Sequence, residues 1–317
     1  MPKKKNTFRH WKNDIAYHAL RMLVLLAGLL PRKIGLAVFG WLGCLLFLLP
    51  TPDRRRTIEH LRLVLGESTE TPSPRRMAAR VYRELGRNLY DAFYLSRCDQ
   101  RDFDRLVRHD DLGAFREAYE RGGGVLVITA HFGCFEMLLH FFARKGFSSF
   151  AIGRRAFDPR VDRLITELRS GPNIEYLDRS GSGRKIVRLL RRGKAMGVLV
   201  DQDTPHVDGV FARFLGRLAY TPSAPVQIAM RQGVPAFVVV TARQRDDTHY
   251  VRLLGPVKME DTGDPERDLV FNVDHVNDLI GEAILRDPAQ WVWMHRRWRH
   301  SPTDPRFVDA PNVENYL

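Results

Sequence analysis

The 317-residue sequence has few cysteines, and the three that it has, Cys44, Cys98 and Cys134, form no Cys-x-x-Cys pair. This scarcity excludes a disulfide framework and a zinc site built on thiolates, and it is typical of a reducing compartment. The sequence also lacks His-Glu-x-x-His and Gly-x-Ser-x-Gly runs, which argues against a zinc peptidase and an ordinary serine hydrolase. Residues 180–185 lack the spacing of a phosphate-binding loop.

Acidic residues are in the minority, with 37 Asp and Glu against 50 Lys and Arg, which gives a net charge of +13. A basic protein of this kind suits a phosphate-bearing partner, namely nucleic acid, an anionic membrane surface or an anionic small substrate. Apolar residues make up 44% of the chain and charged residues 27%, which excludes a disordered chain and a polytopic membrane protein. The length allows one large domain with an appendage, or two modest domains.

Charge is absent from residues 34–50, although basic residues flank this stretch on both sides. Its length is at the lower limit of the ~17–25 residues that cross a bilayer, and the flanking charges give no clear orientation. No small-x-small cleavage site follows, so a cleaved signal peptide fits poorly. We expect residues 1–52 to form a membrane-associating helical segment in the cytoplasmic leaflet, with its Lys and Arg at the headgroups. A true span and a core helix of a soluble domain are the alternatives.

Short apolar runs alternate with helical patterns over much of the remaining chain, residues 53–317. The run Val125–Thr129 is wholly apolar, which is typical of a strand covered on both faces. Further strands are expected at 147–152, 174–177, 196–200 and 236–241, with 250–254 at an edge, and helices at 53–66, 74–97, 111–121, 133–145, 158–169, 184–192, 222–232 and 274–286. This order predicts an α/β fold with a mixed central sheet flanked by helices. Sites in such sheets lie beyond the carboxyl ends of the strands.

The run HFGCFE, residues 131–136, follows the first of these strands and has the spacing His-x4-Glu. The helix after it can turn Glu136 back toward His131, where the carboxylate would accept the Nδ1 proton and leave Nε2 free as a general base. With a thioester donor no covalent nucleophile is needed. Helix amides near Gly133, or a nearby Arg, can then stabilise the oxyanion. The alternatives are an ordinary buried histidine beside a first-turn carboxylate, and a Cys134 nucleophile with His131 as its base.

Residues 123–136 resemble the His-x4-(Asp/Glu) block of the bacterial lipid A biosynthesis acyltransferases, within the wider lysophospholipid acyltransferase superfamily. Other parts of the chain, in order, are similar to further blocks of that family: residues 54–63, 153–169, 199–216 and 288–297. The resemblance therefore extends from about residue 10 to about residue 300. The chain has Cys134 and Phe135 where the family usually has Asn-Trp, and Leu215 where a second Phe is common.

The resemblance implies an O-acyltransferase that moves a fatty acyl chain from acyl carrier protein or coenzyme A to a hydroxyl of a lipid A precursor. Another glycolipid or a lysophospholipid is the alternative acceptor. His131 would be the general base and Glu136 its orienting partner. Arg154 and Arg169 would bind an acceptor phosphate or polarise the acyl carbonyl, and Asp201 would hold an Arg or a sugar hydroxyl. No metal or cofactor is implied. The protein would work at the cytoplasmic face of the inner membrane.

Two readings from other classes compete with the acyltransferase. A nucleic-acid-binding protein would also be basic with interleaved aromatics, but the Arg residues are spread along the whole chain and no binding motif occurs. An inactive scaffold would retain the fold without the chemistry, and the intact His131 and Glu136 argue against it.

The tail at residues 291–300 mixes Trp with Arg and His, and either sits at the membrane interface or packs onto the domain.

Overall fold

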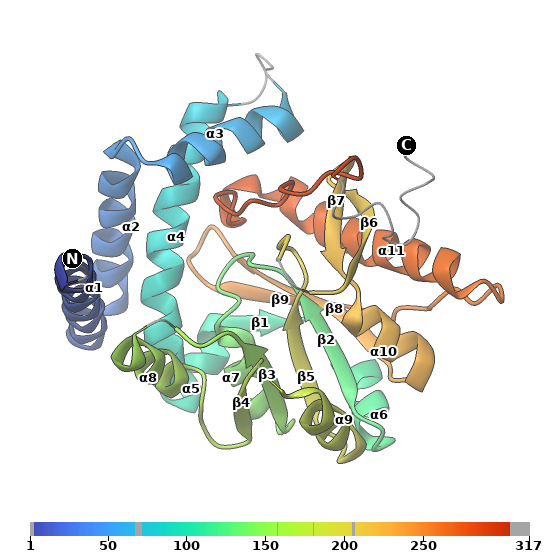
Figure 1. Ribbon diagram of the computed structural model, residues 1–317. Helices are drawn as coiled ribbons and strands as arrows, with labels where there is room; N and C mark the ends of the chain where they lie inside the picture. Colours follow the sequence, from blue (N-terminus) through green and yellow to red (C-terminus); the bar gives the residue numbers. More distant parts are fainter. Residues whose placement is uncertain (1–2, 67–71, 157, 180, 205–206, 305–317) are drawn as a thin grey trace.

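A seven-stranded sheet lies at the centre of the protein, with helices on both of its faces (Figure 1). The structure is a computed structural model that describes residues 3–66, 72–156, 158–179, 181–204 and 207–304. The strand order is β1-β9-β8-β2-β5-β3-β4, and β6 and β7 form a separate two-stranded sheet. The strands are β1 (Val107–His109), β2 (Val125–Thr129), β3 (Ser149–Gly153), β4 (Ile174–Asp178), β5 (Ala195–Leu199), β6 (Gly209–Phe214), β7 (Arg217–Pro222), β8 (Ala236–Arg243) and β9 (His249–Leu254).

All neighbouring strands of the large sheet run parallel except β8 and β9, which run antiparallel. The predicted α/β fold with a mixed central sheet flanked by helices is therefore confirmed. The helices are α1 (Lys3–Leu29), α2 (Arg32–Leu48), α3 (Pro52–Leu65), α4 (Pro74–Arg97), α5 (Gln100–Leu106), α6 (Gly113–Glu120), α7 (Met137–Arg144), α8 (Pro159–Leu168), α9 (Gly183–Arg191), α10 (Ala224–Gln232) and α11 (Pro265–Arg286), followed by a 3₁₀ turn at Pro288–Gln290.

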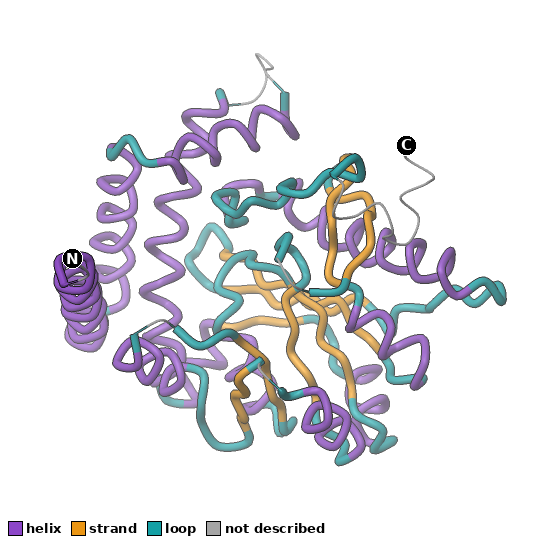
Figure 2. Tube along the Cα trace, viewed as in Figure 1, coloured by secondary structure: helices purple, strands orange, loops and turns teal. Residues whose placement is uncertain are grey.

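The central strand β2 contributes to two hydrophobic cores, one on each face of the sheet. Leu126 and Ile128 belong to a core shared with α9, α10 and α11, whereas Val125 and Val127 belong to a core shared with α6 and α7. Successive side chains of a strand point to opposite faces, so a strand buried on both faces is apolar throughout. The layered arrangement can be followed in Figure 2, where helices lie on either side of the strands.

Four strands differ from the sequence prediction. The strand β9 was expected at an edge, but β1 pairs with its outer side, so β9 is an inner strand. The strand β1 has only three residues, too few for a periodic pattern. The β6–β7 hairpin turns at Leu215 (φ 51°) and Gly216 (φ 75°). Such two-residue turns are usually Asn-Gly or Asp-Gly, and Leu-Gly gives no comparable signal.

The helices α1 to α4 lie together on one side of the sheet, with α2 packed along α4 (Figure 1). Their backbones approach closely because glycines stand at the crossing. A Cβ on Gly43 would come within 2.1 Å of the Tyr82 carbonyl oxygen, and one on Gly86 within 2.0 Å of the Phe39 carbonyl oxygen. Interaxial distance depends on the side chains at the contact, so these glycines set how tightly α2 lies on α4. The boundary that the sequence analysis places at residue 52, between the membrane-associating segment and the rest of the chain, stays a prediction.

Among the described residues no single helix is long and apolar enough to cross a membrane. The helices α2 and α3 pass that test only as a pair, with a bend of 93° between them. Large apolar side chains are nevertheless exposed on α1, on α2 and just after α2: Trp11, Ile15, Met22, Leu25, Leu29, Ile34, Trp41, Leu45, Leu46, Leu48 and Leu49. We call these residues the N-terminal apolar surface.

Candidate active site

The carboxyl ends of β2 and β5, which are paired neighbours in the sheet, bring His131 and Asp201 together. Thr129 and Leu199 are register partners at the ends of these strands. The loops that follow the two strands carry His131 and Asp201. His131 Nδ1 lies 2.8 Å from one Asp201 carboxylate oxygen, and the His131 backbone N–H donates to the other at 2.9 Å. This is the edge at which an α/β sheet is expected to carry its site.

Asp201 is completely buried and holds the imidazole in one orientation. Its second oxygen also accepts a hydrogen bond from the indole N–H of Trp291 at 2.8 Å. Burial alone would raise the pKa of this carboxyl, but the neighbouring His131 and the hydrogen bonds from His131 and Trp291 lower the pKa below its usual range. The carboxylate can only accept, so in the neutral imidazole of His131 the proton is on Nδ1 and the lone pair is on Nε2.

Gln202 lies against that lone pair. Its amide nitrogen is 3.0 Å from His131 Nε2 and 2.8 Å from His295 Nε2, so one amide group bridges the two imidazoles. Burial, followed by the nearby His131, lowers the pKa of His295 to about 4, and His295 is therefore neutral at ordinary pH. Neither Gln202 nor His295 is among the residues predicted from the sequence, and nothing in the sequence indicates that the tail returns to the carboxyl end of β2.

The tail packs onto the domain rather than at a membrane interface. Trp291 and Trp293 are fully buried, and Trp291 pairs with Phe132 in an isolated antiparallel β-bridge. Backbone hydrogen bonds join residues 290–292 to residues 131–133. Gly133 lies where these two backbone segments meet and has a φ of 57°. A Cβ on this residue would lie 1.8 Å from the Thr241 carbonyl oxygen. Only glycine fits that place, which explains the glycine of the HFGCFE run.

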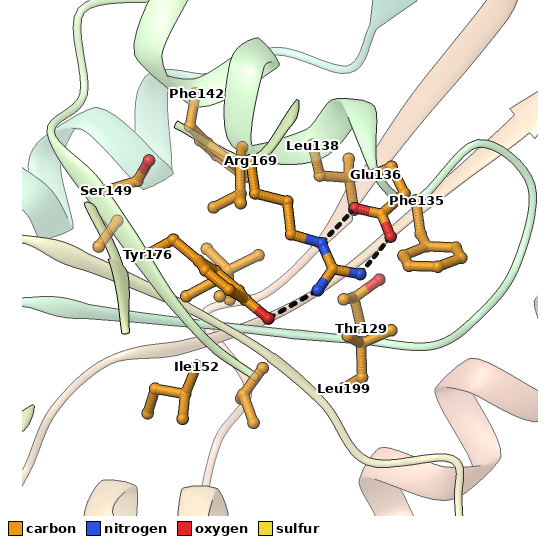
Figure 3. Close-up of a pocket in the computed structure, with 16 residues that line it drawn as sticks. Thr129, Phe135, Glu136, Leu138, Phe142, Ser149, Ile152, Arg169, Tyr176 and Leu199 are labelled. Atoms are coloured by element: carbon orange, nitrogen blue, oxygen red, sulfur yellow. Dashed lines mark hydrogen bonds and ion pairs between the residues drawn. The ribbon is translucent and has the colours of Figure 1, made fainter. Parts of the chain in front are cut away.

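Among the described residues, Glu136 makes no hydrogen bond or ion pair with the His131 imidazole; its carboxylate binds Arg169. The Arg169 guanidinium donates from Nε to Glu136 Oε2 at 2.8 Å, from Nη2 to Glu136 Oε1, and from Nη1 to the Tyr176 hydroxyl at 2.7 Å (Figure 3). Burial would lower the pKa of Arg169, but Glu136 raises it, so the guanidinium stays charged. The structure thus differs from the sequence expectation in the partner of Nδ1, which is Asp201.

Arg154 lies directly after β3, at the same edge of the sheet. Its side chain is exposed and makes no hydrogen bond or ion pair with the described residues. The neighbouring Arg155 binds Asp178 at 2.8 Å. The structure therefore gathers the predicted site residues into one pair, His131 with Asp201, and a second pair, Glu136 with Arg169, with Arg154 separate and facing solvent.

Cys134 is unsuited to act as a nucleophile. Its thiol is buried and directed at the Asn88 carbonyl oxygen, 3.6 Å away. Burial raises the pKa of this thiol well above its usual range, so the reactive thiolate is not available. No cluster of three or more His, Cys, Asp or Glu that could hold a metal ion occurs among the described residues.

An apolar cavity adjoins the Glu136–Arg169 pair. It lies between β2, β3, β5 and α7 and, counted with the space that opens to solvent, measures about 590 Å³; Glu136, Arg169 and Tyr176 are among its lining residues (Figure 3). A second cleft of about 960 Å³ shares Phe135, Glu136 and Arg169 with it and extends between α1, α4 and α8. The Phe135 ring also packs edge-on against the His131 imidazole, with the centroids 4.8 Å apart. The two cavities therefore meet beside the proposed base.

The fold and the site together place a histidine, held by a buried carboxylate, near an apolar cavity at the carboxyl edge of an α/β sheet. The chain belongs to the bacterial lipid A biosynthesis acyltransferase family, whose family model matches residues 1–300. It is accordingly an acyltransferase.

Named relatives match most of the chain. A lipid A biosynthesis lauroyltransferase of Escherichia coli K12 is 25% identical over 255 residues, which cover 78% of this chain and 80% of that protein. A lipid A biosynthesis palmitoleoyltransferase of the same strain is 24% identical over 262 residues, covering 80% of this chain and 81% of that protein. The predicted family and enzyme class are thus confirmed.

Proposed function

We propose that the protein transfers a fatty acyl chain from a thioester of acyl carrier protein or coenzyme A to a hydroxyl of a lipid A precursor. The observation that carries this proposal is the His131–Asp201 pair, which leaves Nε2 as a base beside an apolar cavity in a member of this family. The chemistry needs no metal and no covalent enzyme intermediate, because a thioester is already activated toward attack by an alkoxide-like oxygen.

The reaction starts when an acceptor hydroxyl replaces the Gln202 amide at His131 Nε2. Nε2 takes the hydroxyl proton while the oxygen attacks the thioester carbonyl, and a C–O bond forms. The tetrahedral intermediate then collapses, the C–S bond breaks, and the leaving thiolate receives the proton from Nε2. Asp201 stabilises the imidazolium that exists between the two transfers. A positioned histidine base of this kind contributes on the order of 10²–10⁴ in rate.

The two arginines support different steps in this proposal. Arg169 stays charged at the rim of the cavity, held there by Glu136 and Tyr176, and stabilises the oxyanion. Glu136 therefore contributes through Arg169. Arg154 is exposed at the same edge of the sheet. Its guanidinium forms no hydrogen bond or ion pair with the described residues, so it is available to bind an acceptor phosphate.

The N-terminal apolar surface supports the proposed membrane association, which we assign to the cytoplasmic face of the inner membrane. A soluble monomer rarely exposes this many large apolar side chains close together. Such a surface is usually covered by a lipid bilayer or by another protein. The second cleft is lined by Leu20 and Val24 of α1 and also by Glu136 and Arg169. A lipid acceptor that rests against α1 would have a short path along this cleft to the base.

Acyl transfer by the purified protein in detergent tests the proposal. A lipid A precursor and dodecanoyl thioesters of both carriers are supplied, and the lipid product is measured by mass spectrometry. The wild type should add one acyl chain, and folded His131→Ala should lose the activity by at least about a hundredfold. Transfer by His131→Ala at the wild-type rate would refute the base assignment. Transfer to a lysophospholipid but not to the lipid A precursor would refute the acceptor alone.

A further inference from the structure

The exposed face of α9 carries several arginines and no acidic residue. The opposite face places Leu189 and Leu190 in the hydrophobic core, so the helix is strongly two-sided. Four exposed arginines stand at positions i, i+4, i+7 and i+8 of the helix and its C-cap, and this spacing gathers them on one face: Arg184, Arg188, Arg191 and Arg192. We call these four residues the α9 arginine face.

The charge of this face is not neutralised within the described protein. None of the four guanidinium groups forms a hydrogen bond or ion pair with the described residues. The neighbouring carboxylate of Glu175 binds Lys185 at 2.7 Å and Lys194 at 3.2 Å instead. Like charges four residues apart on a helix repel each other, so Arg184 and Arg188 weaken the helix on which they stand.

Stabilisation of the helix does not account for the α9 arginine face. Cations are favourable in the last turn of a helix, where they meet the negative end of its dipole, and this explains Arg191. Arg184 is in the first turn, where a cation is unfavourable and an acidic residue is favoured. A negatively charged partner that covers the face would relieve both the repulsion between the arginines and the unfavourable position of Arg184.

One end of α9 lies at the edge of the sheet that carries the site. The last residue of β4, Asp178, is the register partner of Gly153 at the end of β3, and α9 begins shortly afterwards at Gly183. From there the helix leads back to the start of β5. Strand β4 is three strands away from β2, which is about 14 Å at the usual strand spacing. Arg184 is therefore within reach of a flexible arm that extends to His131.

The position and shape of this face favour a protein partner. Figure 1 shows α9 at the bottom of the molecule, away from α1 and α2, which carry the N-terminal apolar surface at the left. The groove between the arginines is lined only by α9 and its C-cap, so no second wall among the described residues encloses a small ligand such as a nucleotide. A cationic helix face without such a wall fits the acidic surface of another protein.

We propose that the α9 arginine face binds the acidic surface of the acyl carrier protein that brings the thioester to the site. The proposal rests on the proposed function and adds to it the donor and the place where the donor binds. Carboxylates of the carrier protein pair with the arginines, while its phosphopantetheine arm passes over the carboxyl ends of β3 and β5 to His131. Complementary charge of this kind mainly accelerates the encounter of two proteins, which suits a donor that binds and leaves in every cycle.

Charge reversal on α9 tests the proposal by comparing two donors. Arg184→Glu combined with Arg188→Glu should lower kcat/KM for dodecanoyl–acyl carrier protein by on the order of 10- to 100-fold, mainly through KM. Dodecanoyl-coenzyme A should react at close to the wild-type rate. Added salt should lower kcat/KM of the wild type with the carrier-protein donor and affect the variant much less. An equal loss with both donors, a loss with coenzyme A alone, or no loss at all would overturn the proposal.

Arg76→Glu combined with Arg80→Glu is the matched control. These arginines are also exposed and stand four residues apart near the start of a helix, and their guanidinium groups form no hydrogen bond or ion pair with the described residues. They belong to α4, whose first turns lie near α3, at the other end of the molecule from α9 (Figure 1). The control has the same net charge as the α9 variant and should keep the wild-type kcat/KM. A similar fall in both variants would mean that net charge, and not this face, determines the rate.

Binding measured without an acceptor keeps this proposal distinguishable from the proposed function. Fluorescently labelled acyl carrier protein is titrated with the wild type, the α9 variant and the α4 control, and anisotropy gives the Kd. A weakening of at least about tenfold in the α9 variant alone supports the proposal even if no lipid product forms in any assay, which would count against the proposed function alone. Equal affinity of the three proteins contradicts the proposal. So does an α9 variant that loses binding to phosphatidylglycerol vesicles and keeps its affinity for the carrier protein.

Discussion

Replacing Asp201 by asparagine tests which acid positions the His131 imidazole. Asp201 accepts three N–H groups: the His131 backbone N–H and the Trp291 indole on one oxygen, and His131 Nδ1 on the other. Asparagine has the same shape but only one acceptor oxygen. Because one position accepts two hydrogen bonds, the asparagine oxygen takes that position and the amide nitrogen faces His131 Nδ1.

The expected consequence is a change of tautomer. An amide N–H against Nδ1 forces this nitrogen to accept, so the ring proton moves to Nε2 and the base is lost. We expect kcat to fall by on the order of 10³–10⁴, as when a buried aspartate that holds a catalytic histidine is replaced by asparagine. KM should change little, because Asp201 is completely buried and has no surface that a substrate could contact. The hydrogen bond to Trp291 survives, so the melting temperature should remain close to that of the wild type.

Initial rates of dodecanoyl transfer compare this variant with Glu136→Gln. The Glu136 substitution weakens a charged contact to Arg169 and leaves Nδ1 unaltered, so its expected cost is only about 10- to 100-fold. The opposite ranking would refute the reasoning. If Asp201→Asn transferred acyl chains at nearly the wild-type rate while Glu136→Gln abolished transfer, Glu136 would be the partner of His131 and the His-x4-Glu spacing would describe the working pair.

Three further predictions concern packing, pH and the membrane. Gly43→Val should destabilise the fold by about 1–3 kcal/mol through overpacking of α2 on α4, whereas Gly28→Ala, with no atom within 4 Å of its Cβ, should be neutral or stabilising in thermal unfolding. The His295 pKa of about 4 lies below that of an unfolded histidine, so the unfolded chain binds the extra proton and stability falls as pH drops from about 6.5 toward 4. The loss at about pH 5 should be roughly 2 kcal/mol in urea titrations, and His295→Gln should reduce it. Trp41→Ser should weaken sedimentation with anionic lipid vesicles, whereas Leu285→Ser, exposed on α11, should not; equal loss in both would contradict the assigned surface.

Much of the fold follows from local patterns in the sequence. The apolar run of β2 predicts a doubly covered strand with its observed limits, Val125–Thr129, because burial on both faces demands apolar residues throughout. The β6–β7 hairpin escaped prediction because its turn uses Leu215, a residue rarely found at positive φ. The position of β9 depends on the short strand β1, which pairs across more than a hundred residues of chain.

The candidate site was only partly predictable for a related reason. His131 and Glu136 are close in sequence, so spacing alone suggested that they interact. The structure instead joins His131 to Asp201 through the pairing of β2 with β5, and Glu136 to Arg169 from the end of α8. Both contacts are set by the order of strands in the sheet. Asp201 was already a candidate residue because it follows a strand, but nothing local identified its partner.

The measurement that tests the central claim most directly is the mass of lipid A from cells that lack the gene and are complemented with wild type or His131→Ala. The account predicts that lipid A loses one acyl chain on deletion and that only the wild type restores it. Restoration by His131→Ala, or lipid A unchanged by deletion when purified protein also fails to acylate the precursor, would contradict the account.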